Sequence, residues 1–311
     1  MNVLVVGSSG FIGEALLARL LRDGAKLRDR PIARVIALDL RPSNPRPRLT
    51  MHTGSIVDPQ LLKTVLRNDV DVIFHLASIP GGAAEKDFEL GLRVNLQATT
   101  SLLEAIREAG QQPRLVFAST VAVYGAPLPG LIDESSPASP TLSYGTQKLI
   151  GELLVADYSR RGYLDGVSLR LPGIVARPPS SGMLSIFLSD LIRELSAGRH
   201  YQCPVPANAT SWWMSRTCMV DNLLHAAGLG KEIVKTDRTF LMPVLRATMA
   251  EVVESIANEH GAEVLDRVTY GNDSALQAQF ANLPPLQAPR ATAAGFRHDG
   301  TLQRLVKAAL D

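Results

Sequence analysis

The chain has 311 residues, 46% of them hydrophobic and 20% charged, and this ordinary globular composition excludes a disordered or fibrous protein. Its 32 basic and 30 acidic side chains leave a formal charge of +2, too small to make nucleic acid or an anionic membrane the expected partner. We therefore expect a folded protein with a small-molecule ligand.

Two cysteines, Cys203 and Cys218, stand in neither a CxxC nor a metal-ligand spacing, so we expect no disulfide framework and no metal site. Residues 1–7 contain no basic leader or cleavage site, and no apolar run reaches the roughly 20 residues that span a bilayer. These features favour a soluble protein of the reducing cytoplasm with no membrane partner.

Short β-branched runs alternate with helical stretches through the first half of the chain. The expected strands cover Val3–Val6, Val35–Leu38, Val70–Leu76, Leu115–Ala118 and Val167–Leu171. Continuous apolar strands are typical of a sheet that helices cover on both faces. The alternation therefore predicts an α/β fold with a Rossmann-type, doubly wound parallel sheet.

Apolar residues at helical spacing lie between these strands. They predict helices over Glu14–Asp23 and Asn95–Ala109, which end at Gly24 and Gly110 respectively. The pair Asp58-Pro59 is typical of a helix cap followed by proline at the first helical position.

Beyond residue 171 the composition changes. Several prolines interrupt the segment and the strand–helix alternation is lost, which predicts an irregular lobe. The apolar stretch Thr239–Val244 is expected to return to the main sheet, whereas helices near Ala247–His260 and Leu302–Leu310 belong to the lobe. Trp212, Trp213 and Met214 are expected in the core of that lobe.

The first expected strand runs directly into a glycine-rich turn, GSSGFIG. Glycine is needed where backbone approaches a pyrophosphate and where a helix packs tightly on a strand, and the helix N-terminus then binds the phosphates. A tight turn alone would also explain the glycines, but their place between a strand and an amphipathic helix predicts dinucleotide binding. The residues expected to contact the dinucleotide here are Gly7, Gly10, Phe11, Ile12 and Gly13.

The second expected strand ends at Asp39. A carboxylate at this place binds the ribose 2′-hydroxyl and repels a 2′-phosphate, which favours NAD over NADP. Arg41 lies close by and could pair with a phosphate, and Asp39 could instead be a solvated strand end.

These patterns divide the chain into two parts. We expect an NAD-binding Rossmann domain and a smaller, mostly carboxy-terminal α/β lobe that binds the substrate. The domain covers residues 1–171 with 236–246, and the lobe covers residues 172–235 and 247–311.

Tyr144 and Lys148 are four residues apart, and a helix would place them on one face. A lysine charge beside a tyrosine favours the phenolate and makes it usable as a general base near neutrality. Most such pairs are merely surface neighbours. Ser119 and Thr120 favour a catalytic role for the pair, because they end the fourth expected strand. A hydroxyl there can reach a reacting oxygen at the carboxyl ends of the strands.

With this constellation the sequence resembles the extended short-chain dehydrogenase/reductase family, which contains NAD-dependent epimerases and dehydratases, over nearly its whole length. The resemblance is carried by the glycine turn, Asp39, His75–Ser78, Val94-Asn95, Ser119–Gly125, Tyr144 with Lys148, and Leu169–Pro172. It implies that Tyr144 is the acid/base, that Lys148 binds the nicotinamide ribose and tunes Tyr144, and that Thr120 orients the substrate oxygen.

The resemblance implies further cofactor contacts. They involve Leu76, Ala77 and Ser78 along the cofactor, Pro172 with Gly173 at the carboxamide, and Ser55 and Ile56 at the adenine end. The family commonly has Gly-Asp where this chain has Gly54-Ser55, so a carboxylate contact to adenine is missing. Asn95 either lies near the cofactor or caps a helix, and His75 is expected to be a strand residue.

Several stretches are similar to family members that act on sugar acids. They are Asp87–Asn95, Ser143–Lys148, Gly151–Leu154, Tyr158–Gly162, and Cys203–Pro206 before Trp213–Ser215. This similarity implies NAD-dependent oxidation of a 2-hydroxy sugar acid, such as D-erythronate, to its 2-oxo acid.

Such a substrate carries a carboxylate, which needs a cationic partner when buried. Arg177 is the first candidate and Arg216 the second, although each could instead form a surface or inter-lobe ion pair. Glycines in the loop after Ser78 could admit a ligand or simply form a turn. The expected substrate contacts are Ser78, Gly81, Thr120, Tyr144, Gly173, Arg177 and Arg216.

A nucleotide-sugar epimerase that retains NAD is the alternative enzyme. Dehydratases of the family usually have acidic residues after the position of Thr120. This chain has Val121 and Ala122 there, which disfavours a dehydratase. A non-catalytic NAD(P) sensor would lack the reactive tyrosine or lysine, and both are present. By analogy with the family, a homodimer would form through Asn95–Ala109 and Tyr144–Arg161.

Overall fold

The computed structural model describes residues 1–42, 44–67, 69–179, 183–234 and 237–310. Residues 235 and 236, at the expected boundary between the lobe and the returning strand, lie outside the described residues. The chain forms two compact units. Unit 1 comprises Met1–Val123, Leu142–Arg170 and Val220–Phe240, and unit 2 comprises Tyr124–Thr141, Leu171–Met219 and Leu241–Asp311.

A seven-stranded sheet forms the centre of unit 1, with the order β12-β8-β7-β6-β1-β4-β5. The pairs β1–β4, β4–β5, β1–β6 and β6–β7 are parallel, which confirms the predicted doubly wound sheet. Its strands are β1 (Asn2–Val6), β4 (Arg34–Asp39), β5 (Leu49–Thr53), β6 (Val72–His75), β7 (Arg114–Thr120), β8 (Asp165–Leu171) and β12 (Thr239–Leu241). Strand β5 was not expected, because it is a half-buried edge strand in which apolar and polar residues alternate.

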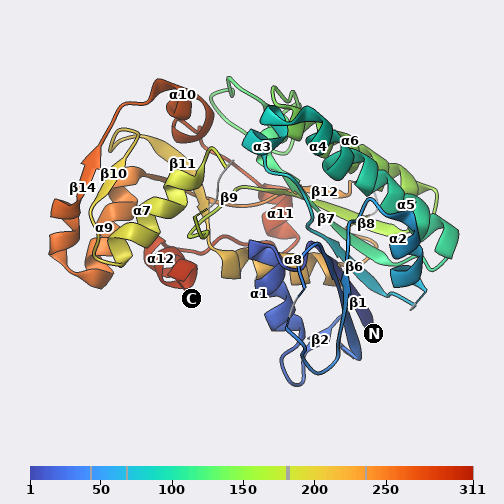
Figure 1. The fold of residues 1–311 in the computed structure, drawn as a ribbon. Helices are drawn as coiled ribbons and strands as arrows, with labels where there is room; N and C mark the ends of the chain where they lie inside the picture. Colours follow the sequence, from blue (N-terminus) through green and yellow to red (C-terminus); the bar gives the residue numbers. More distant parts are fainter. Residues whose placement is uncertain (43, 68, 180–182, 235–236, 311) are drawn as a thin grey trace. The chain divides into compact units, whose positions relative to one another are not determined.

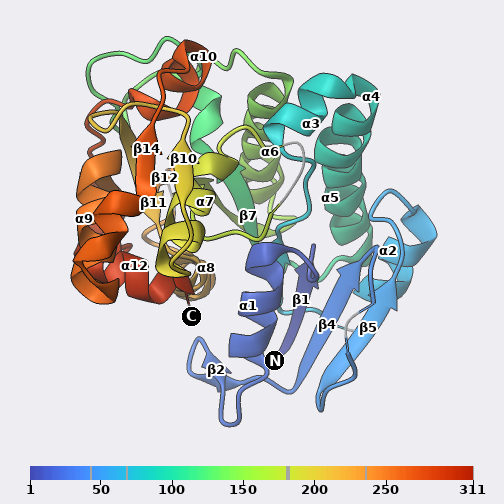
Figure 2. The ribbon, with the colours of Figure 1, turned by 60° about the vertical axis from the view of Figure 1, so that its left-hand side comes forward.

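Helices cover both faces of this sheet (Figures 1 and 2). Helices α2 (Pro59–Leu66), α5 (Ala98–Ala109) and α6 (Ser143–Arg160) share one apolar cluster with side chains of β1, β4, β6 and β7. On the opposite face α1 (Phe11–Leu20) lies beside α8 (Arg216–Gly228), joined by a 2.6 Å ion pair between Arg19 and Asp221. Because helices cover both faces, a ligand is expected at the carboxyl ends of the strands.

Two expected helix boundaries were wrong. Helix α1 ends at Leu20, and Gly24 instead takes φ +70° in the turn before a short hairpin, β2 (Lys26–Leu27) and β3 (Arg30–Pro31). Asn95 does not cap a helix, because it lies within the continuous run of α4 (Phe88–Gly91), a π-helical turn η1 (Leu92–Gln97) and α5. The cap of that run is Asp87, which accepts a hydrogen bond from the Leu90 amide.

Other boundary expectations were right. Gly110 ends α5 in the left-handed conformation at φ +69°. The Asp58 carboxylate accepts hydrogen bonds from the Gln60 and Leu61 amides at 2.9 and 3.3 Å, with Pro59 opening α2.

Unit 2 is more regular than the sequence indicated. Short strands and proline-rich connections hid a small sheet of order β13-β11-β9 and a strand pair β10-β14. Its strands are β9 (Gly173–Ile174), β10 (Tyr201–Cys203), β11 (Thr210–Met214), β13 (Leu245–Thr248) and β14 (Val268–Tyr270). Its helices are α7 (Ile186–Ser196), α9 (Met249–His260), η3 (Ala262–Arg267), α10 (Ser274–Leu276), η4 (Gln277–Ala281), α11 (Pro289–Ala293) and α12 (Leu302–Leu310).

The aromatic residues of β11 belong to the core of unit 2, as expected. Trp213 is fully buried against α7 and α9 residues, and its indole N–H donates to the Ala247 carbonyl at 3.0 Å. Trp212 donates to the Pro284 carbonyl at 2.8 Å. Each buried indole nitrogen is thus satisfied, as stable packing requires.

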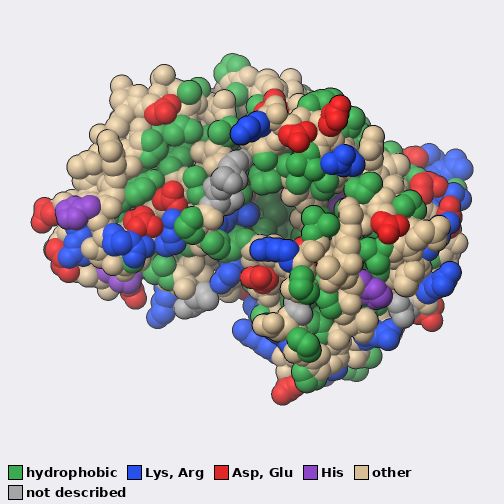
Figure 3. Space-filling model, viewed as in Figure 1, with side chains coloured by type: hydrophobic (Ala, Val, Ile, Leu, Met, Phe, Trp, Pro, Cys, Tyr) green, Lys and Arg blue, Asp and Glu red, His purple; other side chains and the backbone are tan. Residues whose placement is uncertain are grey.

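Acidic and basic side chains are interspersed over the face that Figure 3 displays. Exposed ion pairs of the described residues include Lys63 with Glu108 and Arg107 with Glu104. This mixture agrees with the balanced net charge. Within the described part of the chain, no helix combines the length and apolar character needed to cross a bilayer.

Candidate active site

The glycine turn between β1 and α1 is built around Gly7. Gly7 has φ +86°, and a Cβ there would lie 2.5 Å from the backbone nitrogen of Ala77. Its amide donates to the Leu38 carbonyl at 2.9 Å. The turn is thereby held between the ends of β4 and β6, and both its φ and its close contacts require glycine.

Gly13 allows α1 to pack directly on this turn. A Cβ at Gly13 would lie 2.2 Å from the Gly7 carbonyl oxygen. The helix begins at Phe11, followed by Ile12. Its N-cap Gly10 has no side chain that could accept a hydrogen bond from the amides of the first turn. The N–H groups and the dipole of α1 therefore create a place for a phosphate.

Ser8 provides a test of whether a dinucleotide fits here. Its side chain is fully buried, and its hydroxyl has no hydrogen-bond partner among the described residues. Buried polar atoms are normally satisfied, if not by protein then by a ligand or water. The unsatisfied hydroxyl and the glycine-only backbone agree with a bound pyrophosphate.

Asp39, at the end of β4, lies against the same turn. Its carboxylate accepts hydrogen bonds from the Ser9 amide at 2.9 Å and from the Arg41 amide at 3.2 Å. The Arg41 guanidinium donates to the Ser9 carbonyl, and the Ser9 hydroxyl donates to the Arg41 carbonyl. The structure thus brings Asp39, Arg41 and the glycine turn together, where an adenosine ribose would be recognised.

The two residues expected at the adenine end have different surroundings. The Ser55 hydroxyl accepts a hydrogen bond from the Val57 amide at 3.2 Å, whereas Ile56 is buried in the apolar cluster of unit 1. A contact from this turn to an adenine would therefore come from Ser55 or the backbone.

The segment after β6 lies over the glycine turn. The Leu76 amide donates to the Val6 carbonyl at 2.8 Å, and the Ala77 backbone is the closest neighbour of Gly7. Ser78 follows in a half-buried position. Leu76 and Ala77 are thus placed beside the glycine turn, and their expected contact with the cofactor stays a prediction.

Asn95 anchors this segment from the π-helical turn. Its Oδ1 accepts from the Ile79 amide at 2.7 Å, and its Nδ2 donates to the Ile79 carbonyl at 3.1 Å and to Gln147 Oε1 at 2.8 Å. Asn95 is fully buried, and both its N–H bonds are used within the protein. Its side chain therefore fixes the loop after Ser78 relative to α6.

Tyr144 and Lys148 lie on one face of α6, as expected. Lys148 is almost fully buried, and its Nζ donates to the Ala118 carbonyl at 2.9 Å. The same nitrogen lies 4.9 Å from the centre of the Phe117 ring and 5.8 Å from that of Tyr144. Burial lowers the pKa of Lys148 to about 7, while the charge of Glu152 opposes that change.

His75 ends β6 close to this ammonium. Burial and then the charge of Lys148 lower the pKa of His75 to about 3, so it is neutral at physiological pH. Its Nε2 is 2.9 Å from the Thr99 hydroxyl. His75 is thus a buried strand residue, as expected.

The start of α6 is held by α3 (Gly81–Lys86). Its N-cap Leu142 provides no side-chain acceptor, and the Glu85 carboxylate instead accepts the Ser143 amide hydrogen. A Cβ on Gly81 would lie 3.6 Å from the Tyr144 ring. Gly81 therefore begins a helix rather than lying in a loop, and it lies beside the Tyr144 ring.

Thr120 is the last residue of β7. Its hydroxyl accepts a hydrogen bond from the Ala122 amide at 3.1 Å, at the start of a 3-10 turn η2 (Val121–Tyr124). This bond leaves the hydroxyl proton able to donate to a substrate oxygen.

The sequence predicted no role for Glu152, a buried carboxylate close to Ser119. Ser119 donates to the Glu152 carboxylate, which also forms an ion pair with Arg170 at 2.8 Å. Two signals could have found it. Arg170 interrupts an apolar strand, and Glu152 follows Lys148 by one helical turn.

Four predicted contacts lie in unit 2. Pro172 is buried and Gly173 forms part of β9, whereas Arg216 begins α8. Arg177 donates from Nε to the Ile174 carbonyl at 3.1 Å, and Arg193 donates to the Arg177 carbonyl at 2.6 Å. The Ile174 carbonyl thus orients the Arg177 guanidinium, and the Arg193 side chain holds the Arg177 backbone, both within unit 2.

Comparison with known proteins decides the family. A profile of the NAD dependent epimerase/dehydratase family matches residues 3–214. The chain belongs to this family. It is an NAD-dependent dehydrogenase of the extended short-chain type, with NAD as its cofactor, which confirms the predicted family, fold and cofactor.

Two relatives and one solved structure are similar over nearly the full length. D-erythronate dehydrogenase of Cupriavidus necator is 39% identical, covering 100% of this chain and 98% of the relative. D-erythronate dehydrogenase of Haemophilus influenzae is 31% identical, covering 99% and 98%. The nucleoside-diphosphate-sugar epimerase of Agrobacterium tumefaciens has a TM-score of 0.92 and 34% identity, covering 98% of this chain and 92% of that structure.

Proposed function

We propose that this dehydrogenase oxidises a 2-hydroxy sugar acid to its 2-oxo acid, with D-erythronate as the first candidate. The observation that carries the proposal is the Tyr144–Lys148 pair, in which a buried lysine lies on the same helical face as a tyrosine beside the start of α3. Both full-length relatives bear the name D-erythronate dehydrogenase, which favours a sugar acid.

The proposed roles follow from the chemistry of the side chains. Tyr144 accepts the proton of the substrate hydroxyl, and Thr120 donates a hydrogen bond to the same oxygen. Lys148 stabilises the phenolate by its charge and binds the nicotinamide ribose. NAD, when bound, supplies a hydride acceptor.

Around NAD, we propose the glycine turn for the pyrophosphate and Asp39 for the adenosine ribose. The remaining proposed cofactor contacts are Ser55, the Ile56 backbone, Leu76, Ala77, Ser78, Asn95 and Pro172, with Asn95 acting through the Ile79 backbone. Residues 1–171 with 236–246 would bind NAD, and the rest of the chain would bind the substrate.

The substrate carboxylate requires a cationic partner. We propose Arg177 for this role, with Arg216 as the second candidate and with Ser78, Gly81 and Gly173 as further contacts. A planar guanidinium matches a carboxylate with two hydrogen bonds.

The first experiment is NAD reduction with a panel of four-carbon and longer aldonates, repeated with NADP. We expect turnover with at least one 2-hydroxy acid and a preference for NAD. If every sugar acid fails while NAD still binds, the substrate assignment is wrong.

The second candidate function is nucleotide-sugar epimerisation, which the similarity to the Agrobacterium tumefaciens protein favours. An epimerase would retain NAD through purification and would ignore free aldonates. Spectroscopic analysis of NAD released from the purified protein therefore distinguishes the two candidates.

We also propose a cytoplasmic homodimer. Both cysteines are free thiols, which suits a reducing compartment. Helix α6, which lies in the expected interface, carries the exposed apolar side chain of Leu153, which is 64% exposed. Replacing Leu153 by Glu should convert a dimer into a monomer in light scattering after size exclusion, and an unchanged mass would contradict this interface.

A further inference from the structure

A charged group lies buried in unit 1 that the proposed chemistry does not use. Glu152 is on α6, four residues after Lys148, and its side chain is 4% exposed. Its partner Arg170, on β8, is 14% exposed. Burying a carboxylate and a guanidinium is costly, so they need a reason beyond filling space.

The Glu152 carboxylate is fully occupied by donors. Arg170 approaches it with Nε at 3.1 and 3.3 Å from the two oxygens and with Nη2 at 2.8 Å from one of them. Ser119 donates its hydroxyl to the first oxygen. The carboxylate is thereby held rigidly between β7, β8 and α6.

These contacts register α6 against the end of β7. Lys148 binds the Ala118 carbonyl and Glu152 binds the Ser119 hydroxyl, so consecutive strand residues meet side chains one helical turn apart. Thr120 comes directly after Ser119. A shift of α6 by a fraction of a turn would move Lys148 and Thr120 apart, which the two bonds oppose.

The negative charge of Glu152 also stabilises the charged form of the buried Lys148 ammonium. The groups around Lys148 are His75 of β6, the Phe117 ring of β7, and Tyr144 and Glu152 of α6. His75 is neutral and adds no negative charge. Burial and Glu152 act in opposite directions on the pKa of Lys148.

We propose that Glu152 is a positioning residue of this dehydrogenase, which holds Thr120 and Lys148 in register through Ser119 and places a negative charge one helical turn from the Lys148 ammonium. The proposal rests on the roles proposed above for those two residues. Arg170 orients the Glu152 carboxylate for this role.

The direct test measures the titration of Lys148 in the full-length protein by NMR of labelled lysine side chains, with Lys148→Met to assign the signal. Glu152→Gln keeps the shape and removes the charge. We expect the pKa of Lys148 to fall by about one unit or more in Glu152→Gln. No substrate is needed, so the result is independent of the substrate assignment.

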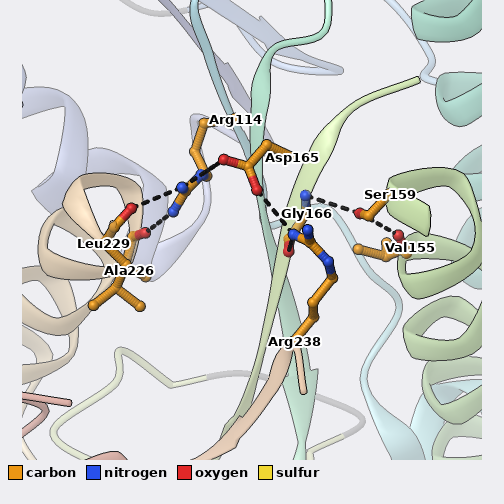
Figure 4. Close-up of polar contacts among 8 residues, drawn as sticks. All are labelled: Arg114, Val155, Ser159, Asp165, Gly166, Ala226, Leu229 and Arg238. Atoms are coloured by element: carbon orange, nitrogen blue, oxygen red, sulfur yellow. Dashed lines mark hydrogen bonds and ion pairs between the residues drawn. The ribbon is translucent and has the colours of Figure 1, made fainter. Parts of the chain in front are cut away.

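The matched control is Asp165→Asn. Arg114 and Asp165 begin β7 and β8, and Asp165 pairs with Arg114 and Arg238 at 2.6 and 2.8 Å (Figure 4). Arg114 is further held by two carbonyls of the α8 region. This arginine–carboxylate pair lies at the opposite ends of the same strands, so Asp165→Asn should leave the pKa of Lys148 unchanged.

Turnover gives a second readout. At neutral pH, Glu152→Gln should lower kcat roughly fivefold or more, leave the Kd for NAD within about twofold, and change the pH profile of kcat. Ser119→Ala removes the register bond but no charge, so it should lower kcat without changing the pH profile. Asp165→Asn should leave both unchanged.

Glu152→Gln removes the carboxylate that faces the largely buried Arg170 guanidinium and could fail to fold. In that case Glu152→Asp carries the test, because it keeps the negative charge but withdraws the carboxylate from the Ser119 hydroxyl by one methylene. A lowered pKa of Lys148 in Glu152→Gln, or a lowered kcat with an unchanged Kd for NAD in Glu152→Asp, supports the proposal. A pKa of Lys148 in Glu152→Gln equal to that of the parent protein, or a parental kcat in Glu152→Asp, overturns it.

Discussion

The Asp39 carboxylate accepts a hydrogen bond from the Ser9 amide at 2.9 Å, so the end of β4 is tied to the glycine turn. Arg41 closes the same contact from the other side by donating to the Ser9 carbonyl. An anion and a cation therefore lie together at the place proposed for the adenosine ribose, where NAD and NADP differ.

This pairing predicts a change in cofactor preference. Asp39→Ser removes the charge that repels a 2′-phosphate, so kcat/KM for NADP should rise relative to NAD by about tenfold or more. Steady-state kinetics with both cofactors measure the ratio. Asp39→Ser with Arg41→Ala should lose most of this gain, and an equal gain in both variants would exclude Arg41 as the phosphate ligand.

The packing at Gly13 predicts a loss of cofactor binding. A Cβ there would lie 2.2 Å from the Gly7 carbonyl oxygen, so Gly13→Ala must displace α1 from the turn. The Kd for NAD, measured by calorimetry, should increase by at least about tenfold. Gly130→Ala is the control, because a Cβ at Gly130 meets no atom within 4 Å. Equal affinities of the two variants would contradict the assignment of the turn.

The role proposed for Tyr144 predicts a loss in kcat alone. Tyr144→Phe removes the proton acceptor and should lower kcat by about 100-fold or more with little change in the Kd for NAD. Tyr158→Phe is a matched change on the same helix, where the hydroxyl donates to Glu104. It should retain activity, and near-normal turnover by Tyr144→Phe would remove Tyr144 as the base.

The role proposed for Arg177 predicts an effect on substrate binding. Arg177→Ala removes a cationic partner of the carboxylate and should raise KM for the acid by about tenfold with a smaller change in kcat. The same measurement on Arg216→Ala compares the second candidate. An unchanged KM in Arg177→Ala together with a raised KM in Arg216→Ala would transfer the role.

Burial of Lys148 predicts a pH-dependent cost to stability. Its pKa is lowered from 10.5 to about 7, so the unfolded chain binds more protons between these values and the free energy of unfolding rises with pH across them. Lys148→Met removes the cost of burying the charged form, which is fully present below pH 7. Its gain in the free energy of unfolding should be largest near pH 6 and decrease toward pH 10. Urea denaturation at several pH values measures it, and a gain that is constant with pH would show that Lys148 is not buried as a charged group.

Local sequence patterns determined much of this protein. The glycine turn and its helix are adjacent in the chain, and Tyr144 and Lys148 share a face because a helix repeats every 3.6 residues. Asp58 and Pro59 marked a helix start for the same reason, since capping depends on neighbouring residues. The family resemblance added the expected cofactor and reaction.

Tertiary structure decided the contacts between distant segments. The sequence left Asn95 between a cap and a cofactor neighbour, and the fold uses its amide to join Ile79 and Gln147. Ser119, Glu152 and Arg170 come from two strands and a helix, and only sheet order and packing bring them together. Spacing along the chain sets backbone periodicity within a few residues, whereas the pairing of remote side chains depends on how complete elements pack.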